Sequence, residues 1–233
     1  MAANNPPANI YIDGFNLYRG CLENSPYKWL DLVALAERLA VGHTVKRVRY
    51  FTAHVEDPAA NRRQLVYLRA LKTLTRLEVD ASGVFTTHIV IRPLADQPAQ
   101  GMVAVLEWHR NGQWLPLRRP AQGYWVRASI SHKTEKGSDV NLATYLVADA
   151  FRGDMAAAWV ISGDSDLEAP IKLVNTDLVP VHVVNPRPNK PSAQLKAAAR
   201  TYTSLAVADL AASQLADPVI DAQGREIRKP QSW

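Results

Sequence analysis

The chain has 233 residues, of which 47% are hydrophobic and 21% charged, and its formal net charge is +5. This length can bury a sizeable core, and the composition is that of an ordinary globular protein. No apolar stretch approaches the ~20 residues that span a bilayer, and a single cysteine excludes an intrachain disulfide framework or a cysteine-built zinc site. We therefore expect a cytoplasmic protein without membrane contact, whose charge permits a polyanionic partner.

Strand-like and helix-like patterns alternate along most of the chain. We expect a short disordered lead at 1–8. In the first part of the chain the patterns predict strands at 9–12, 45–52 and 77–79, and helices at 30–39 and from 58 onwards. In the last part they predict strands at 157–161 and 178–184, helices at 139–151 and 167–175, and one or two helices between 195 and about 215. Asp57 is expected to cap the helix that Pro58 opens. This alternation predicts an α/β fold with a mostly parallel central sheet, whose site lies beyond the carboxyl ends of the strands.

Residues 84–131 interrupt this alternation. They contain four prolines and three glycines between short β-type runs, among them 102–108 and 113–117, which Asn111–Gly112 is expected to join as a hairpin. We interpret the segment as a β-rich insertion within a domain over 9–215, followed by a C-terminal tail at 216–233.

Four aspartates stand where elements of the predicted sheet begin or end. Asp13 follows the first strand, Asp164 and Asp166 follow a later strand, and Asp139 begins a helix. Each has an ordinary interpretation as a helix cap or turn residue. Because the carboxyl ends of parallel strands meet at one edge, however, we expect the four carboxylates to converge, and their mutual repulsion favours a bound cation.

Carboxylate clusters of this kind suit a hard divalent cation, Mg²⁺ or Mn²⁺. Such a metal can activate a bound water and stabilise charge on a phosphoryl oxygen. The sequence contains no H-E-x-x-H zinc motif, no G-x-S-x-G nucleophile elbow and no Walker A or G-x-G-x-x-G phosphate loop.

Three segments, in order along the chain, carry a family resemblance. They are I-Y-I-D-G-F-N-L-Y (10–18), K-G-S-D-V-N-L-A (136–143) and W-V-I-S-G-D-S-D-L (159–167). Together they resemble the NYN domain family, also called LabA-like or DUF88, within the PIN-like nuclease superfamily. Over roughly 9–185, the resemblance implies a three-layer α/β sandwich and a metal-dependent ribonuclease site.

The resemblance also implies which residues form that site. The implied metal ligands and catalytic acids are Asp13, Asp139, Asp164 and Asp166, and the implied substrate-positioning residues are Asn16, Ser162 and Lys136. Family members often carry a further Asp inside the helix, where this chain has Tyr145. Asp149 follows one turn later. Because of this departure at position 145, we expect one firmly bound metal ion rather than two.

The leading hypothesis is a metal-dependent endoribonuclease with RNA as its partner. Arg19, Lys133 and Lys136 are candidates for holding the phosphate backbone. The alternative is a catalytically silent RNA-binding or partner-binding module with a vestigial site. A haloacid-dehalogenase-like phosphatase is disfavoured, because it needs a second Asp two residues after the first, where this chain has Phe15. Assembly as a homo-oligomer is left open.

Overall fold

The computed structural model describes residues 5–93 and 127–233. The hairpin expected at Asn111–Gly112 and the strands expected at 102–108 and 113–117 lie outside these residues. The chain divides into two compact units, Met1–Phe85 with Glu135–Trp233 and, separately, Thr86–Thr134. The candidate site belongs to the first.

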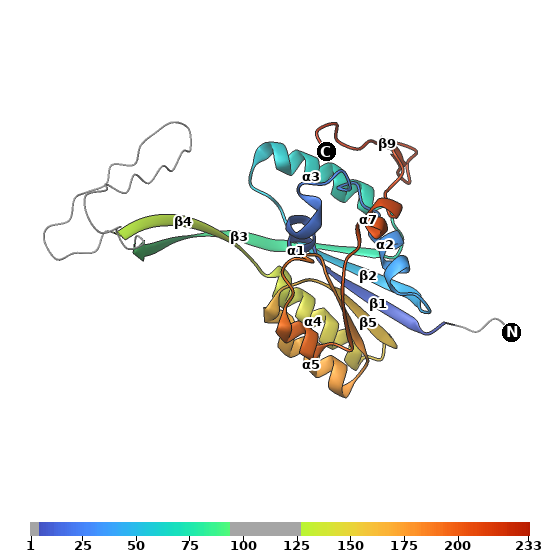
Figure 1. The fold of residues 1–233 in the computed structure, drawn as a ribbon. Helices are drawn as coiled ribbons and strands as arrows, with labels where there is room; N and C mark the ends of the chain where they lie inside the picture. Colours follow the sequence, from blue (N-terminus) through green and yellow to red (C-terminus); the bar gives the residue numbers. More distant parts are fainter. Residues whose placement is uncertain (1–4, 94–126) are drawn as a thin grey trace, which may run out of the picture. The chain divides into compact units, whose positions relative to one another are not determined.

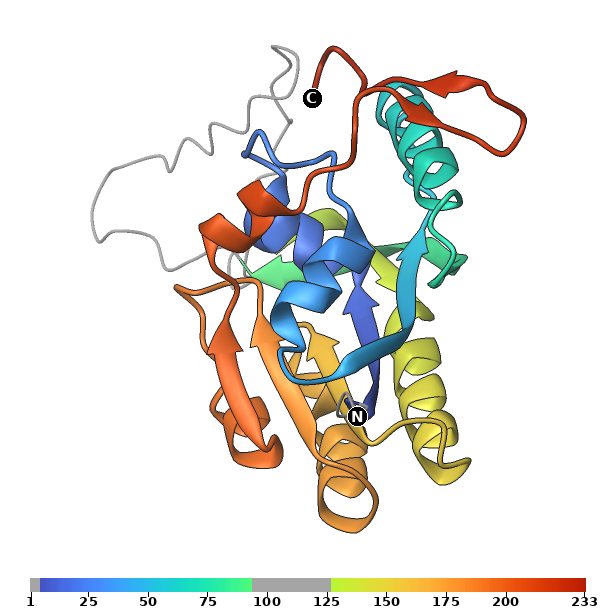
Figure 2. The ribbon, with the colours of Figure 1, turned by 90° about the vertical axis from the view of Figure 1, so that its right-hand side faces the viewer.

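A seven-stranded sheet has the order β4-β3-β2-β1-β5-β6-β7. The strands are β1 (Pro7–Asp13), β2 (Thr44–Ala53), β3 (Leu77–Pro93), β4 (Arg127–Lys136), β5 (Ala157–Ile161), β6 (Val181–Asn185) and β7 (Thr201–Ser204). The pairs β3–β2, β2–β1, β1–β5, β5–β6 and β6–β7 are all parallel. Figure 2 shows β1, β2, β5, β6 and β7 side by side with their arrowheads at one edge. The expected α/β fold with a mostly parallel sheet is confirmed.

Helices cover both faces of this sheet, giving three layers (Figure 1). They are α1 (Gly14–Leu17), the π-helical turn η1 (Tyr18–Leu22), α2 (Leu32–Leu39), α3 (Pro58–Leu71), α4 (Ser138–Phe151), the 3₁₀ turn η2 (Ser165–Leu167), α5 (Glu168–Asp177), α6 (Ala193–Ala198) and α7 (Val207–Ala212). One hydrophobic core lies against α2, α3 and α7, and the other against α4, α5 and α6. Strand β1 serves both, because Ile10 and Ile12 enter the first core and Tyr11 the second.

Local sequence signals explain where two of the helices begin. Asp57 caps α3, accepting a hydrogen bond from the Ala60 N–H at 2.7 Å, and Pro58 occupies the first turn as expected. Asp31 caps α2 in the same way, through the backbone N–H groups of Val33 and Ala34. Among the helices of residues 5–93 and 127–233, none is long and apolar enough to cross a membrane.

The C-terminal fifth of the chain differs from the sequence-based expectation. In place of helix alone, Thr201–Ser204 forms β7, which pairs with the edge of β6. Its Thr-Tyr-Thr run favours a strand, but the surrounding alanine-rich sequence masks it. The tail contains a two-stranded hairpin of β8 (Val219–Ile220) and β9 (Glu226–Ile227), and the Trp233 ring packs against Trp29 and Tyr67.

Two histidines contact a tryptophan of β5, His182 by stacking on its ring and His43 edge-on. The Trp159 ring centroid lies 4.4 Å from that of His182 and 4.9 Å from that of His43. His182 Nδ1 is 2.8 Å from Thr201 Oγ1. Burial lowers the pKa of His182 below its usual 6.5, and the charges of His43 and Arg200 lower it further.

The free energy of unfolding is therefore expected to fall as the pH drops through about 6.5, because the unfolded chain takes up a proton at His182 that the folded chain resists. The loss ends below the lowered pKa of the folded state. In His182→Gln this contribution is absent, so its thermal midpoint should fall less than that of the wild type between about pH 7.5 and pH 5. Equal decreases in the two proteins would show that His182 does not couple folding to pH.

Candidate active site

The first strand ends in a carboxylate that the next turn holds in place. Asp13 is 4% exposed and caps α1, and its Oδ1 accepts a hydrogen bond from the Asn16 N–H at 2.9 Å. The turn is tight: a Cβ atom at Gly14 would lie 2.7 Å from the Phe51 carbonyl oxygen and 2.8 Å from the Tyr50 ring. A larger residue there would displace the Asp13 carboxylate from the sheet edge.

A buried serine connects this carboxylate to the loop after β5. Ser162 is fully buried, and its Oγ donates a hydrogen bond to Asp13 Oδ2 at 2.9 Å. The same Oγ accepts a hydrogen bond from the Asp164 N–H at 3.1 Å. Residues almost 150 positions apart in sequence are thus joined at the carboxyl edge of the sheet.

A second connection runs parallel to the first. Asn16 Oδ1 accepts a hydrogen bond from the Gly163 N–H at 3.1 Å. A Cβ atom at Gly163 would lie 2.7 Å from Asn185 Oδ1 and 3.4 Å from Asn16 Oδ1, so a larger residue there would force the Asn185 amide to move. Asn16 and Ser162, both predicted as positioning residues, therefore fix the loop that carries the acidic pair.

The two aspartates of the loop occupy different surroundings. Asp164 is half-buried and caps η2, with its Oδ1 accepting a hydrogen bond from the Asp166 N–H at 3.0 Å. Asp166 is exposed. Asp164 is thus held beside the Asp13–Ser162 pair through its backbone N–H, while its carboxylate caps η2 and Asp166 is exposed to solvent.

The remaining predicted residues lie at the junction of β4 and α4. Lys136 is exposed at the end of β4, Gly137 follows with a φ of +106°, and the half-buried Asp139 is in the first turn of α4. Across the part of the chain that the structure describes, no group of three or more His, Cys, Asp or Glu residues could hold a metal ion. The structure thus joins Asp13 to Asp164 through Ser162 but gathers no cluster of three or four acids there.

The family model of the NYN domain matches residues 95–206. The matched segment includes Asp139, Asp164 and Asp166, while Asp13 precedes it. This segment of the chain is thus similar to the NYN domain family. NYN domains are generally hydrolytic nucleases that act on RNA and usually employ divalent metals.

Two known proteins are similar to this chain over nearly its whole length. The 6-hydroxy-3-succinoylpyridine 3-monooxygenase HspA of Pseudomonas putida S16 is 27% identical over an alignment 244 positions long, which covers 96% of this chain and 74% of that protein. A crystal structure of a protein of unknown function from Vibrio parahaemolyticus superimposes with a TM-score of 0.52 at 16% identity, covering 92% of this chain and 99% of that one. The second likeness concerns the fold alone.

The oxygen donors at this edge of the sheet fit an Mg²⁺ site better than a closed structural metal site. A closed structural site needs about four protein ligands, and no such group occurs among the described residues. Mg²⁺, in contrast, commonly keeps several waters and binds through one or two carboxylates together with a substrate phosphate. Asp13 and Asp164, the two acids linked through Ser162, match the second description.

Position 145, where the resemblance implies an acid, carries an aromatic ring. The guanidinium carbon of Arg49 lies 4.2 Å from the Tyr145 ring centroid, and the Phe51 ring lies 5.9 Å away. Asp149, one turn further along α4, is fully buried, and it accepts hydrogen bonds from Arg49 Nε and the Tyr11 hydroxyl, both at 2.9 Å. Asp149 is therefore committed to the interface between α4 and the sheet.

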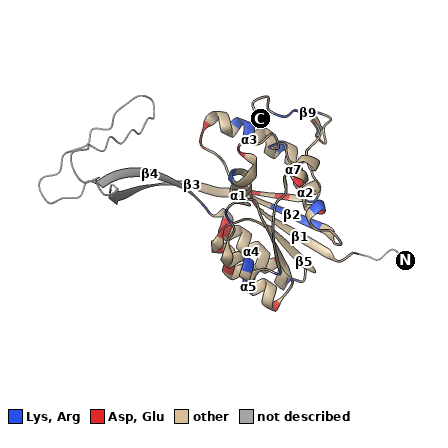
Figure 3. Cartoon of the chain, in the orientation of Figure 1, with Lys and Arg blue, Asp and Glu red and all other residues tan. Residues whose placement is uncertain are grey.

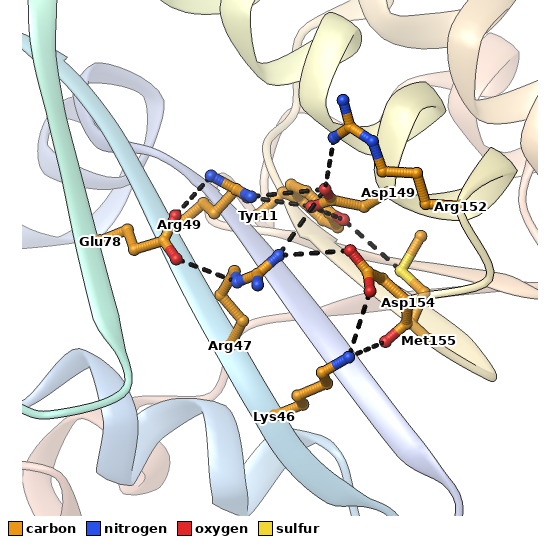
Figure 4. A network of polar contacts seen from close by, with 9 residues as sticks. All are labelled: Tyr11, Lys46, Arg47, Arg49, Glu78, Asp149, Arg152, Asp154 and Met155. Carbon is orange, nitrogen blue, oxygen red and sulfur yellow. Dashed lines mark hydrogen bonds and ion pairs between the residues drawn. The ribbon is translucent and has the colours of Figure 1, made fainter.

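This interface contains a larger polar network (Figure 4). Strand β2 contributes Lys46, Arg47 and Arg49, and the acidic partners of these three residues are Glu78, Asp149 and Asp154. Asp149 also binds Arg152 and the Tyr11 hydroxyl, which in addition lies near the sulfur of Met155. Burial raises the pKa of Tyr11 well above its usual value, and the Asp149 carboxylate raises it further, so the phenol stays protonated and donates. The basic residues of β2 (Figure 3) thus serve packing against α4.

The structure also reveals an element of the site that the sequence did not: the loop after β6. Asn185 Nδ2 donates hydrogen bonds to the carbonyl oxygens of Arg187 (2.7 Å) and Lys190 (3.3 Å), and its Oδ1 accepts one from the Arg187 N–H. The loop also touches η1, since a Cβ atom at Gly20 would lie 2.8 Å from the Pro186 carbonyl oxygen. The sequence feature that could have indicated this loop is Asn185, a polar residue that ends a strand directly before a Pro-Arg-Pro run.

Proposed function

We propose that this chain is a metal-dependent endoribonuclease that hydrolyses RNA phosphodiester bonds with Mg²⁺ or Mn²⁺ at the carboxyl edge of the sheet. The observation that carries the proposal is the buried hydroxyl of Ser162, which donates to the Asp13 carboxylate and accepts from the backbone N–H of Asp164, so that both aspartates are held at one edge of the sheet. Buried groups with both hydrogen bonds satisfied are rigid, so this pair is fixed before substrate arrives. Pre-arranged charge of this kind is what phosphoryl chemistry requires.

In this proposal each residue has a defined task. Asp13 and Asp164 would hold the ion, which when bound makes a coordinated water acidic and stabilises charge on the phosphoryl oxygen. Asp139 and Asp166 would orient the attacking water through hydrogen bonds. Asn16 and Ser162 would hold Asp13 and Asp164 in their positions relative to one another.

Backbone phosphates would be held by basic residues around this edge. Among the described residues, Arg19 on η1 and Arg187 and Lys190 on the loop after β6 form no ion pair, unlike the arginines of β2. Lys136 at the end of β4 is the fourth member of this basic rim. Cations without internal partners beside an acidic site suit a polyanion that passes over it.

Arg187→Ala is expected to weaken the binding of single-stranded RNA and to reduce the slope of log affinity against log salt by about 1, because one phosphate contact is lost. The measurement is fluorescence anisotropy with labelled RNA on the non-cleaving Asp164→Asn background. Arg228→Ala is the matched control, because Arg228 is exposed after β9 and paired with Glu226. An unchanged salt slope in Arg187→Ala would remove Arg187 from the rim.

The likeness to the Pseudomonas monooxygenase favours a second candidate, hydroxylation of a pyridine-type acid. The two candidates separate in one experiment. The purified chain is incubated with single-stranded RNA and Mg²⁺, and in parallel with 6-hydroxy-3-succinoylpyridine, dioxygen and a reduced nicotinamide. RNA cleavage alone supports the proposal, whereas hydroxylated product without RNA cleavage would overturn it.

A further inference from the structure

Tyr145, which stands on α4 where an acid was expected, lies near the same end of the sheet as Asp13. In the pairing of β1 with β2, Asp13 is opposite Phe51. The rings of Phe51 and Tyr145 are 5.9 Å apart at an angle of 34°. Tyr145 therefore lies next to the carboxyl edge at which the acidic pair is held.

One side of the Tyr145 ring rests on a rigid support. Arg49 has a side chain that is 12% exposed, and its guanidinium carbon lies 4.2 Å from the ring centroid. Arg49 itself is fixed by Asp149 Oδ2, 2.9 Å from its Nε, and by Glu78 of the neighbouring strand. Because Tyr145 and Asp149 are one turn apart on the same face of α4, both reach the same guanidinium.

Tyr145 nevertheless remains accessible to solvent. Tyr145 is 37% exposed, whereas Phe51 beside it is 1% exposed. A ring that is immobilised by a cation and a second aromatic, yet still exposed, is a stacking platform: every nucleobase has a π-face, and such stacking tolerates any base.

We propose that Tyr145 stacks a nucleobase of single-stranded RNA next to the phosphate bound at the acidic edge. This inference rests on the proposed function and specifies its substrate: an unpaired strand, since a base within a duplex cannot present its face to a side chain. Tyr145 thereby takes a binding role at a position where the family often has an acid, and Arg49 and Asp149 act as the positioning residues of the ring.

The test measures binding of labelled single-stranded RNA to Asp164→Asn protein by fluorescence anisotropy, with an abasic strand of equal length as the second probe. Tyr145→Ala and Tyr145→Leu are expected to weaken binding of the intact strand about 5- to 100-fold and to leave binding of the abasic strand within about twofold. Tyr145→Trp should bind the intact strand at least as well as the parent. Tyr145→Leu guards against a packing defect, because leucine covers Arg49 without offering an aromatic face.

Phe151→Ala is the matched control, since Phe151 is a 70% exposed aromatic residue at the far end of the same helix. It should bind both strands like the parent. Equal losses for intact and abasic strands in Tyr145→Ala, or no loss for either, would overturn the inference while leaving the proposed function intact. If the parent binds no RNA, the proposed function fails, and the stacking role of Tyr145 fails with it.

Discussion

Asp164→Asn is expected to reduce RNA cleavage by roughly 100-fold or more, the size of effect found when a single charge-stabilising group is removed from an active site. The fold should be retained, because the asparagine Oδ1 can still accept the hydrogen bond that Asp164 Oδ1 receives from the Asp166 N–H. What is lost is the negative charge beside the Asp13–Ser162 pair. The measurement is the single-turnover cleavage rate of end-labelled RNA.

Two further substitutions provide comparisons for the cleavage rate of Asp164→Asn. Asp166→Asn should have a smaller effect, because Asp166 is exposed. Asp177→Asn, an exposed aspartate at the other end of α5, should cleave at the wild-type rate. If Asp164→Asn also cleaved at the wild-type rate, the acidic edge would not be where the chemistry takes place.

Asp149→Ala is expected to lower the free energy of unfolding by about 3–5 kcal/mol, because removing one partner of a buried ion pair leaves the other charge uncompensated. Asp149 is fully buried and within 3.7 Å of guanidinium nitrogens from Arg47, Arg49 and Arg152. In a chain of this size the loss corresponds to a decrease of roughly 10 °C in the thermal midpoint. Urea titration and thermal melting both measure it.

The double variant Arg49→Met/Asp149→Leu shows whether Asp149→Ala is unstable because a contact is lost or because a buried charge is left unpaired. Replacing both members of a buried pair by apolar side chains of similar size is often neutral, so the double variant should recover much of the stability that Asp149→Ala loses. Asp154→Ala, in the exposed part of the same network, should have a much smaller effect. A double variant as unstable as Asp149→Ala would contradict this interpretation of the network.

The layout of the fold followed from simple patterns. Strands such as 157–161 are continuous apolar runs because both of their faces are covered, and Asp57–Pro58 marks a helix start by capping chemistry that is local. The strand β7 was missed because four residues pair with a sheet edge that only the tertiary structure creates. Propensity alone does not contain that information.

The candidate site was predictable to the extent that topology alone brings its residues together. Parallel strands bring Asp13 and Asp164 to one edge, and this could be expected from their positions at strand ends. Side-chain geometry could not: the bridge through Ser162 and the contact of Asn185 with Gly163 depend on distances of a few ångströms. The engagement of Asp149 with Arg49 is equally invisible in the sequence, since the two residues are 100 positions apart.

The central claim is that metal held at the Asp13–Asp164 edge cleaves RNA. The most direct test compares cleavage of end-labelled single-stranded RNA by the wild-type chain in Mg²⁺, in Mn²⁺ and in EDTA, with Asp164→Asn in parallel. We expect cleavage in either metal, none in EDTA, and loss of the metal-dependent activity in the variant. Absence of cleavage in both metals, or cleavage that persists equally in EDTA and in the variant, would contradict it.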